Sequence, residues 1–492
     1  MKSILSVSVL ISFALLLGRV SGFFREMLLA ARFGASETAD AAILILTLPD
    51  FLVGLLLVGG FNAALVPELK QRHGADRQAL LLRVALGAVA AFGIVALTFY
   101  LFPNLIIGLL APQMDVAQFP HFTRAFHVSL LALPLAALIG ISTSYLNTVG
   151  RFTLPSFSVL VFNTLLCVYL LLPIAPDRVL LGFSFAILIA TSCRLAFQLL
   201  GMKDIFTRPN FTLLRQPTKL IKRFAAGILA YSVIVGVAIL FRSLHATNGD
   251  GFLAVFNYAE KLFWLPAALM IAPLVTISLP LLSNLTTNKN EYEKTAVIGL
   301  QAAWALGFMA LALGYSFMPL LVKLAYQRGS LLADDVAAIT AVARVMVLCL
   351  PAYAILQLSA AALNAAKRPQ TVMINAFMSL GLSVAGYLLL KLAFSTPLAA
   401  PWGFVIFHII AAYLNFRALG FSASGKSSLT STMIKTTLRI GLCIAPFAVL
   451  LAQGVLLSLW ENLALLIIAT AISALLIVPN LRPLRHMKIS TA

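Results

Sequence analysis

Charged side chains are scarce in this sequence. Only 10% of its 492 residues are Asp, Glu, Lys or Arg, whereas 61% are hydrophobic, and the mean hydropathy is +1.01. Soluble domains carry about 25% charged residues. The scarcity therefore excludes a soluble globular protein and predicts an all-α integral membrane protein.

Cysteine and histidine are too few and too scattered to form a framework of disulfides or metal ligands. The four cysteines lie far apart in apolar segments, which is typical of buried small hydrophobic residues. The six histidines form no recognisable ligand set. No carboxylate lies between Asp335 and Glu461, so an acidic site for a coupling ion is not expected there. We predict no catalytic residue, no metal site and no cofactor.

Long apolar runs, in contrast, are abundant. A helix needs about 20 apolar residues to cross a bilayer, and by that measure we count fourteen candidate spans. They cover residues 4–33, 39–66, 79–110, 123–148, 155–173, 178–200, 223–244, 252–282, 295–324, 336–364, 370–393, 398–418, 433–457 and 461–480. The first run has no small-residue cleavage site, so we expect a retained helix. Kinks are expected at prolines such as Pro49, Pro134, Pro266, Pro273 and Pro351.

The formal net charge of +19 is explained by topology. Lys and Arg are concentrated in alternate loops, and cation-rich loops face the cytoplasm. We therefore expect the lipid bilayer, and no nucleic acid, to be the partner of this basic chain. Both termini are predicted to be cytoplasmic.

The sequence also contains a weak internal repeat. The segment TLPDFLVGLL (47–56) resembles WLPAALMIAP (264–273), and YLNTVGR (145–151) resembles ALNAAKR (362–368), with the same offset along the chain in both pairs. This offset spans six predicted helices, so both copies have the same orientation in the membrane. We predict two pseudo-symmetric six-helix lobes around a central cavity, residues 1–200 and 223–418. Residues 201–222 would be a cytoplasmic linker, and residues 419–492 two additional helices with a basic tail.

Several ionisable residues lie inside the predicted spans. They are Arg19, Arg25 and Glu26 in the first span, Asp40 and Asp50 in the second, and Glu260 and Lys261 in the eighth. A cation near the middle of a span costs roughly 2.5 to 3.5 kcal/mol, so such residues face protein or water. Arginine offers bidentate hydrogen bonds that suit phosphate. We predict that Arg19, Arg25 and Lys261 form an anion site in the cavity, supported by the four carboxylates.

The alternative for these residues is an internal ion pair, such as Arg25 with Asp40, or snorkelling to the interface. Four other cations lie near predicted helix ends and are expected to snorkel, namely Arg124, Arg194, Lys323 and Arg344. Gly18 and Gly22 form a G-x-x-x-G pair, which predicts close approach of another helix at this face.

Residues 18–69 resemble the MviN/MurJ family of lipid-linked saccharide flippases, in the multidrug, oligosaccharidyl-lipid and polysaccharide flippase superfamily. The family pattern R-x-x-G-x-x-R-[DE] begins at Arg19 and ends at Glu26, and its L-P pair follows at residues 48–49. Weaker similarity continues through LNTVGRFTLP, NYAEKLFWLP and SLPLLSNL.

This resemblance implies a two-lobe transporter of the bacterial inner membrane. Such a protein would move an undecaprenyl-pyrophosphate-linked saccharide from the inner to the outer leaflet by alternating access. The resemblance assigns the pyrophosphate to Arg19 and Arg25, matches an eighth-helix arginine to Lys261, and matches Asp40 to an aspartate near the cavity mouth. It also makes enzymes of cell-envelope biosynthesis candidate partners.

The sequence departs from the lipid II flippases of this family at several positions. Val53, Gly54 and Val58 stand where an arginine pair and an acidic residue are typical, and Trp264 stands where a carboxylate is common. The predicted cavity is thus less charged. Two cargoes stay open, peptidoglycan lipid II and an exopolysaccharide repeat unit.

Two other classes of function are the alternatives. A cation-coupled drug antiporter of the same superfamily would favour carboxylates around its cargo, whereas the first predicted helix has more cationic than acidic side chains. A membrane enzyme acting on lipid-linked sugars would need acid and base groups on a sizeable external loop. The predicted outward loops are short and poor in such groups.

Overall fold

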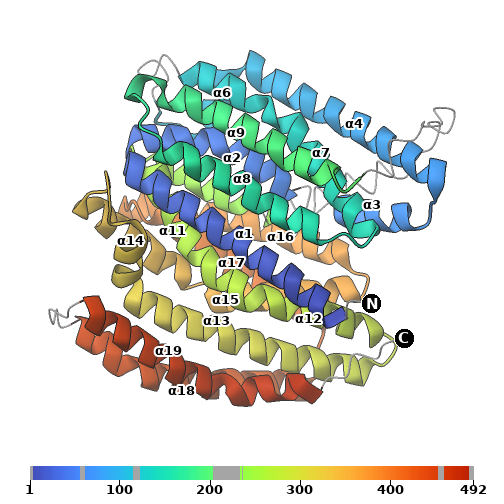
Figure 1. Cartoon of the computed structure of the whole chain (residues 1–492). Coiled ribbons are helices and arrows are strands. Elements are labelled where there is room, and N and C mark those ends of the chain that lie inside the picture. The colour runs from blue at the N-terminus through green and yellow to red at the C-terminus, as the bar shows by residue number, and fades with distance from the viewer. Residues whose placement is uncertain are drawn as a thin grey trace. The chain divides into compact units, whose positions relative to one another are not determined.

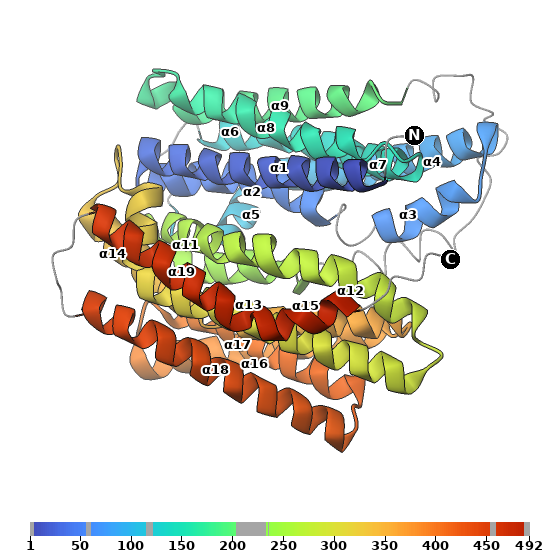
Figure 2. The same ribbon diagram turned by 60° about the horizontal axis from the view of Figure 1, so that its bottom comes forward.

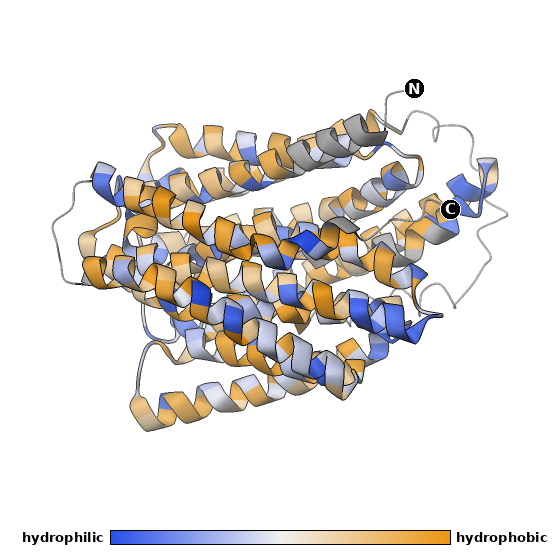
Figure 3. Ribbon diagram, turned by 90° about the horizontal axis from the view of Figure 1, so that it is seen from below, coloured by the Kyte–Doolittle hydropathy of each residue, from blue (hydrophilic) through white to orange (hydrophobic). Residues whose placement is uncertain are grey.

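The structure is a computed structural model that describes residues 4–55, 61–114, 122–202, 233–234, 236–452 and 459–486. Every regular element in these ranges is a helix, which confirms the predicted all-α class. Hydrophobic residues cover most of the length of these helices (Figure 3). The chain forms two compact units, the first comprising Met1–Ala254 with Arg328–Leu331 and the second Val255–Gln327 with Leu332–Ala492.

Each predicted span overlaps helix wherever the structure describes it. In the described ranges, ten helices are long and apolar enough to cross a membrane, or eleven if one bent pair is a single span. The predicted count of fourteen is therefore not confirmed. Most of the predicted linker, from residue 203 onward, lies outside the described residues, and the lobe boundaries stay a prediction.

The first unit is a bundle built from short and long helices (Figure 1). In chain order these are α1 (Ile4–Phe33), α2 (Glu37–Leu55), α3 (Phe61–Lys70), α4 (Gly74–Leu101), α5 (Pro103–Leu110), α6 (Phe122–Leu130), α7 (Ala132–Thr148), α8 (Thr153–Leu171) and α9 (Pro176–Leu199). The helix Gly236–Ala246 follows. Helix α1 packs along α8, and α8 packs along α9 (Figures 1 and 2).

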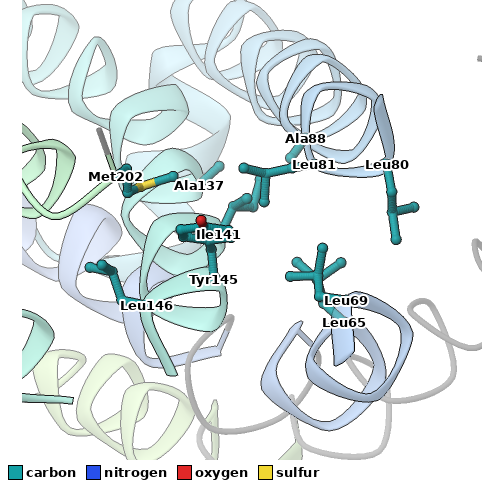
Figure 4. Packing of buried hydrophobic residues seen from close by; sticks show 10 residues of the cluster. All are labelled: Leu65, Leu69, Leu80, Leu81, Ala88, Ala137, Ile141, Tyr145, Leu146 and Met202. Atoms are coloured by element: carbon teal, nitrogen blue, oxygen red, sulfur yellow. The ribbon is translucent and has the colours of Figure 1, made fainter. Parts of the chain in front are cut away.

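One hydrophobic core of this unit lies where α3, α4 and α7 meet (Figure 4). Leu65 and Leu69 of α3 and Leu80 and Leu81 of α4 are buried there together with Tyr145 of α7. Inside a bilayer, helix association depends on such van der Waals packing, because lipid tails are as apolar as leucine. The core therefore fixes the position of α7, on which α2 and α9 also pack.

The second unit contains the remaining helices. They are α11 (Phe252–Pro266), α12 (Ala272–Asn284), α13 (Lys289–Tyr326), α14 (Ala333–Val347), α15 (Leu350–Ala365), α16 (Pro369–Phe394), α17 (Ala399–Leu419), α18 (Ala423–Ala452) and α19 (Leu459–Leu481), with the π-helix η5 (Ala267–Ile271) and the 3-10 helix η6 (Arg482–His486). Both α18 and α19 pack on α13 (Figure 1).

Two of the predicted kinks are present in this second unit. Pro266 ends α11 and is followed directly by η5. Helices α14 and α15 form the bent pair, with an angle of 45° between them, and Pro351 lies in the first turn of α15. Proline lacks an N–H donor and clashes with the preceding turn, so it interrupts the regular hydrogen bonding at both places.

The internal repeat reappears as two turns with the same hydrogen bonds. At the end of α7, the backbone N–H of Arg151 donates to the carbonyl of Leu146 at 2.8 Å, and at the end of α15 Arg368 donates to Leu363 at 2.8 Å. These are the 6→1 bonds of a Schellman motif. The residue before each arginine is left-handed, with φ of 76° at Gly150 and 58° at Lys367.

Side-chain contacts repeat at the same offset. The guanidinium of Arg151 donates to the carbonyl of Gly201, and that of Arg368 donates to the carbonyl of Ala418. In each copy the arginine thus ties the turn to the end of a later helix, α9 or α17. The two copies of the repeat therefore share local structure as well as sequence.

Candidate anion-binding site in the first unit

Arg25 on α1 is the centre of a buried polar cluster. Arg25 is only 5% exposed, yet its guanidinium donates hydrogen bonds to three other side chains. Nη2 donates to Glu26 Oε1 at 2.7 Å and to Asp50 Oδ2 at 3.2 Å, and Nη1 donates to Asn163 Oδ1 at 3.1 Å. Helices α1, α2 and α8 each contribute to the cluster.

The small residues of α1 allow this arrangement. Asn163 on α8 also donates through Nδ2 to the carbonyl of Gly18 and to Ser21 Oγ, both at 3.1 Å. A Cβ atom at Gly22 would lie 3.3 Å from Asn163 Nδ2, and one at Gly18 would lie 3.3 Å from Val159. The predicted close approach at the G-x-x-x-G pair is confirmed, and its partner is α8.

The two carboxylates of the cluster differ in their environment. Glu26 is 2% exposed, whereas the side chain of Asp50 is 37% exposed. A buried guanidinium needs a counter-charge, because an isolated charge in a medium of low dielectric constant is very costly. Glu26 supplies that charge from the buried side of the cluster, and Asp50 supplies it from the exposed side.

Arg194 on α9 adds a second buried cation. It is 6% exposed, and its Cζ lies 5.9 Å from the centroid of the Phe162 ring, the same distance as the Cζ of Arg25. The snorkelling prediction was therefore wrong for Arg194, because the ring of a neighbouring helix accepts the guanidinium inside the bundle. Arg124 and Lys323 are exposed, and Arg344 is half-buried with its Cζ 5.4 Å from the centroid of the Tyr315 ring. Snorkelling of these three residues stays a prediction.

Arg19 lies on a different part of the α1 surface from Arg25. It is exposed on α1, and its separation from Arg25 along the helix places it about 120° around the axis. Of the two first-helix arginines, Arg25 is the one buried with carboxylates, and a shared anion site with Arg19 stays a prediction.

Asp40 of α2 accepts two backbone hydrogen bonds, and its part in the cavity stays a prediction. Its Oδ2 accepts from the backbone N–H of Gly251 at 2.8 Å, and its Oδ1 accepts from that of Ala254 at 2.7 Å. These two donors lie at the start of α11, where backbone N–H groups have no partner within the helix. Asp40 therefore caps α11. The alternative pairing of Arg25 with Asp40 is wrong, since Arg25 pairs with Glu26 and Asp50.

The other predicted site residues lie in the second unit. Glu260 is 7% exposed and accepts a hydrogen bond from Trp264 Nε1 at 2.7 Å. Trp264 in turn meets Tyr353 edge to face, with ring centroids 5.5 Å apart. Lys261, the next residue on α11, is half-buried. The convergence of Lys261 with Arg25 on one cavity stays a prediction.

Sequence reasoning missed two polar residues of the first unit. Asn163 carries no charge and lies in an apolar run, so nothing in the sequence singled it out. Arg242 is 6% exposed and donates to Thr47 Oγ1 of α2 at 2.8 Å. The internal repeat could have identified Arg242. Arg242 follows Arg25 at the same offset that relates the repeated segments, and each of the two arginines comes directly after a phenylalanine. The side chains at Val53, Gly54 and Val58 lie outside the described residues.

The chain is similar to known transporters in sequence. A family model described as lipid II flippase MurJ matches residues 29–473. Lipid II flippase MurJ of Burkholderia cenocepacia is 28% identical over 333 residues, 63% of each chain. A protein of Aquifex aeolicus named probable lipid II flippase MurJ is 26% identical over 421 residues, 81% of each chain. The match thus spans less than two thirds of the Burkholderia protein and four fifths of the Aquifex protein.

Solved structures share the fold. A structure of lipid II flippase MurJ in an inward closed conformation has a TM-score of 0.84 and 18% identity, covering 97% of this chain and 100% of that one. An inward-facing multidrug transporter of the MATE family has a TM-score of 0.63 and 14% identity, and the match covers 84% of this chain and 95% of that one. At such identities the likeness concerns the fold alone. The family match, which extends over most of the chain, shows that this protein belongs to the lipid II flippase MurJ family and is a multi-pass transporter of the bacterial inner membrane.

Proposed function

We propose that this transporter is a flippase for lipid II, the undecaprenyl-pyrophosphate-linked saccharide of peptidoglycan synthesis, and moves it from the inner to the outer leaflet by alternating access. The observation that carries the proposal is the buried Arg25 with one buried and one exposed counter-ion. Membership of the lipid II flippase MurJ family supports the same cargo.

A diphosphate matches the bonding capacity of Arg25. The guanidinium presents a planar fork of donors that suits phosphate oxygens, and charge-assisted hydrogen bonds are about twice as strong as neutral ones. When the headgroup arrives, Asp50 is the partner it replaces, since Asp50 lies at the accessible side. Glu26 keeps Arg25 oriented in both states.

The remaining predicted residues have supporting parts in this proposal. Arg19 and Lys261 are further cations for the headgroup. Asp40 fixes the start of α11, and Glu260 fixes Trp264 one turn along from itself. Both termini are proposed to be cytoplasmic, and enzymes that make or use the lipid-linked precursor are proposed as partners.

A second cargo is favoured by one specific feature. Trp264 stands where a carboxylate is common in the resembled flippases, and its ring contacts Tyr353 and Phe263. An aromatic surface in that place would suit a less charged oligosaccharide, such as an exopolysaccharide repeat unit on the same lipid carrier.

The proposal is tested by transport with an arginine variant. Arg25→Gln keeps a polar side chain but removes the charge, so the rate of lipid II flipping in proteoliposomes should fall at least tenfold, with normal membrane insertion. Arg417→Gln is the matched control, because Arg417 is exposed and also lies over a ring, with Cζ 5.8 Å from the centroid of Tyr413. Near-normal flipping by Arg25→Gln would refute the assignment.

A further inference from the structure

Arg25 and Arg194 share one aromatic ring. The Cζ atom of each guanidinium lies 5.9 Å from the centroid of Phe162, so the two Cζ atoms are separated by no more than the sum of these two distances. The three residues come from α1, α8 and α9, which pack side by side (Figure 2). Two buried cations on helices of a single unit thus lie over the same ring.

The two arginines differ in how they are satisfied. Arg25 is paired with Glu26 and Asp50, whereas Arg194 forms no ion pair with any described residue. In the described part of the chain, the Nε atoms of both arginines are buried and have no hydrogen-bond partner. Buried donors without a partner are rare in native proteins, and each such group calls for an explanation.

The charges of the cluster balance only while Asp50 is present. Arg25 and Arg194 are opposed by Glu26 and Asp50, and of these four side chains only Asp50 is substantially exposed. If Asp50 turns toward solvent, two guanidiniums remain with one carboxylate. The cluster then carries a net positive charge in a place of low dielectric constant, where an anion binds strongly.

We propose that Arg194 is a second arginine of the anion site, and that Arg25 and Arg194 together distinguish a diphosphate from a monophosphate. A diphosphate extends over two phosphoryl groups, so it reaches both guanidiniums and takes the place of Asp50. A monophosphate satisfies only one of them. This inference rests on the proposed function, and it names the residue that gives the site its selectivity.

The test is isothermal titration of the purified full-length protein in detergent with inorganic pyrophosphate and with inorganic phosphate. We expect the wild type to bind pyrophosphate more tightly than phosphate. Arg194→Gln should weaken pyrophosphate binding at least tenfold and leave phosphate binding nearly unchanged, while Arg194→Lys should retain part of the affinity. Arg417→Gln is the control and should bind both anions as the wild type does.

Asp50→Asn gives an independent readout. Removing the competing counter-ion should tighten pyrophosphate binding several-fold. If the carboxylate of Asp50 had a purely structural role, its removal would leave the affinity for pyrophosphate unchanged or would lower it. This variant tests the replacement of Asp50 by the diphosphate, on which the inference rests, and unchanged or weaker binding by Asp50→Asn contradicts that replacement. If Arg194→Gln fails to fold, as judged by its unfolding temperature, Arg194→Lys decides the role of Arg194, and a wild-type ratio of pyrophosphate to phosphate affinity in that variant overturns the inference.

The outcomes separate the inference from the function on which it rests. If Arg25→Gln loses pyrophosphate binding while Arg194→Gln binds as the wild type does, the inference is overturned and the proposed function stands. If the wild type itself does not bind pyrophosphate, both are overturned.

Discussion

Asp40 shows how a buried carboxylate in this protein is satisfied without a cation. Both of its oxygens accept backbone N–H groups, from Gly251 and from Ala254. A carboxylate at the start of a helix is also favoured by the helix dipole. Its burial, at 5% exposure, therefore reflects a structural role at the start of α11.

This role predicts a loss of stability when the carboxylate is changed. Asp40→Asn leaves one acceptor oxygen and turns an N–H₂ group toward a backbone donor, so the free energy of unfolding should fall by about 1 to 3 kcal/mol. The measurement is thermal unfolding in detergent. Asp177→Asn is the control, because Asp177 is exposed in the first turn of α9. Equal unfolding temperatures for the two variants would contradict the capping role.

At the residue scale, the sequence predicted which charges enter the membrane but not which partners they meet there. Arg25, Glu26 and Asp50 were recognisable because charge in an apolar run is costly. Arg194 was expected to snorkel, since its distance from a helix end allowed it. Whether a long cation snorkels or is buried depends on the face that a neighbouring helix offers, here the ring of Phe162.

At the scale of elements, the turn Arg328–Leu331 is held against the end of α1. The backbone N–H of Ser330 donates to the carbonyl of Ala31 at 2.7 Å, and Ser330 Oγ donates to the carbonyl of Arg32 at 3.1 Å. Gly329 makes this approach possible, because a Cβ atom there would lie 2.1 Å from the Ala31 oxygen. Its φ of 64° is also left-handed.

Gly329→Ala should therefore detach the turn from α1. The left-handed backbone alone costs about 1 to 2 kcal/mol for a residue with a Cβ, and the clash with a backbone oxygen adds to it. Thermal unfolding of the purified variant is the measurement. Gly93→Ala within α4 serves as the control, since a Cβ there meets nothing within 4 Å and alanine is the better helix former by about 1 kcal/mol. If Gly329→Ala were as stable as this control, the close contact would be disproved.

Element boundaries were partly predictable for local reasons. Proline positions predicted kinks at Pro266, where a π-helix follows α11, and at Pro351, where α14 and α15 bend, because proline acts on its own helix. The break between α6 and α7 near Leu131 lies just before Pro134 and follows the same logic. The sequence did not reveal that the span 79–110 contains a second short helix, α5, since apolar content continues across the break at Phe102.

At the scale of the whole molecule, the repeat was the most informative signal. A buried hydrogen bond between side chains of two helices also recurs at the repeat offset. In the first copy it joins Gln198 to Ser158, and in the second copy it joins Asn415 to Asn375. These contacts use different residue types, so sequence similarity alone does not show them. The number of spans was less predictable, because length and hydropathy do not distinguish one bent span from two helices.

The proposed function of this transporter is the flipping of lipid II. Its most direct test is mass spectrometry of undecaprenyl-linked intermediates in cells depleted of the protein, with wild-type and Arg25→Gln genes supplied for complementation. We predict that lipid II accumulates on depletion, that the wild-type gene reverses the accumulation, and that Arg25→Gln does not. Accumulation of a different lipid-linked oligosaccharide, with lipid II at its normal level, would contradict the claim and identify an exopolysaccharide precursor as the cargo.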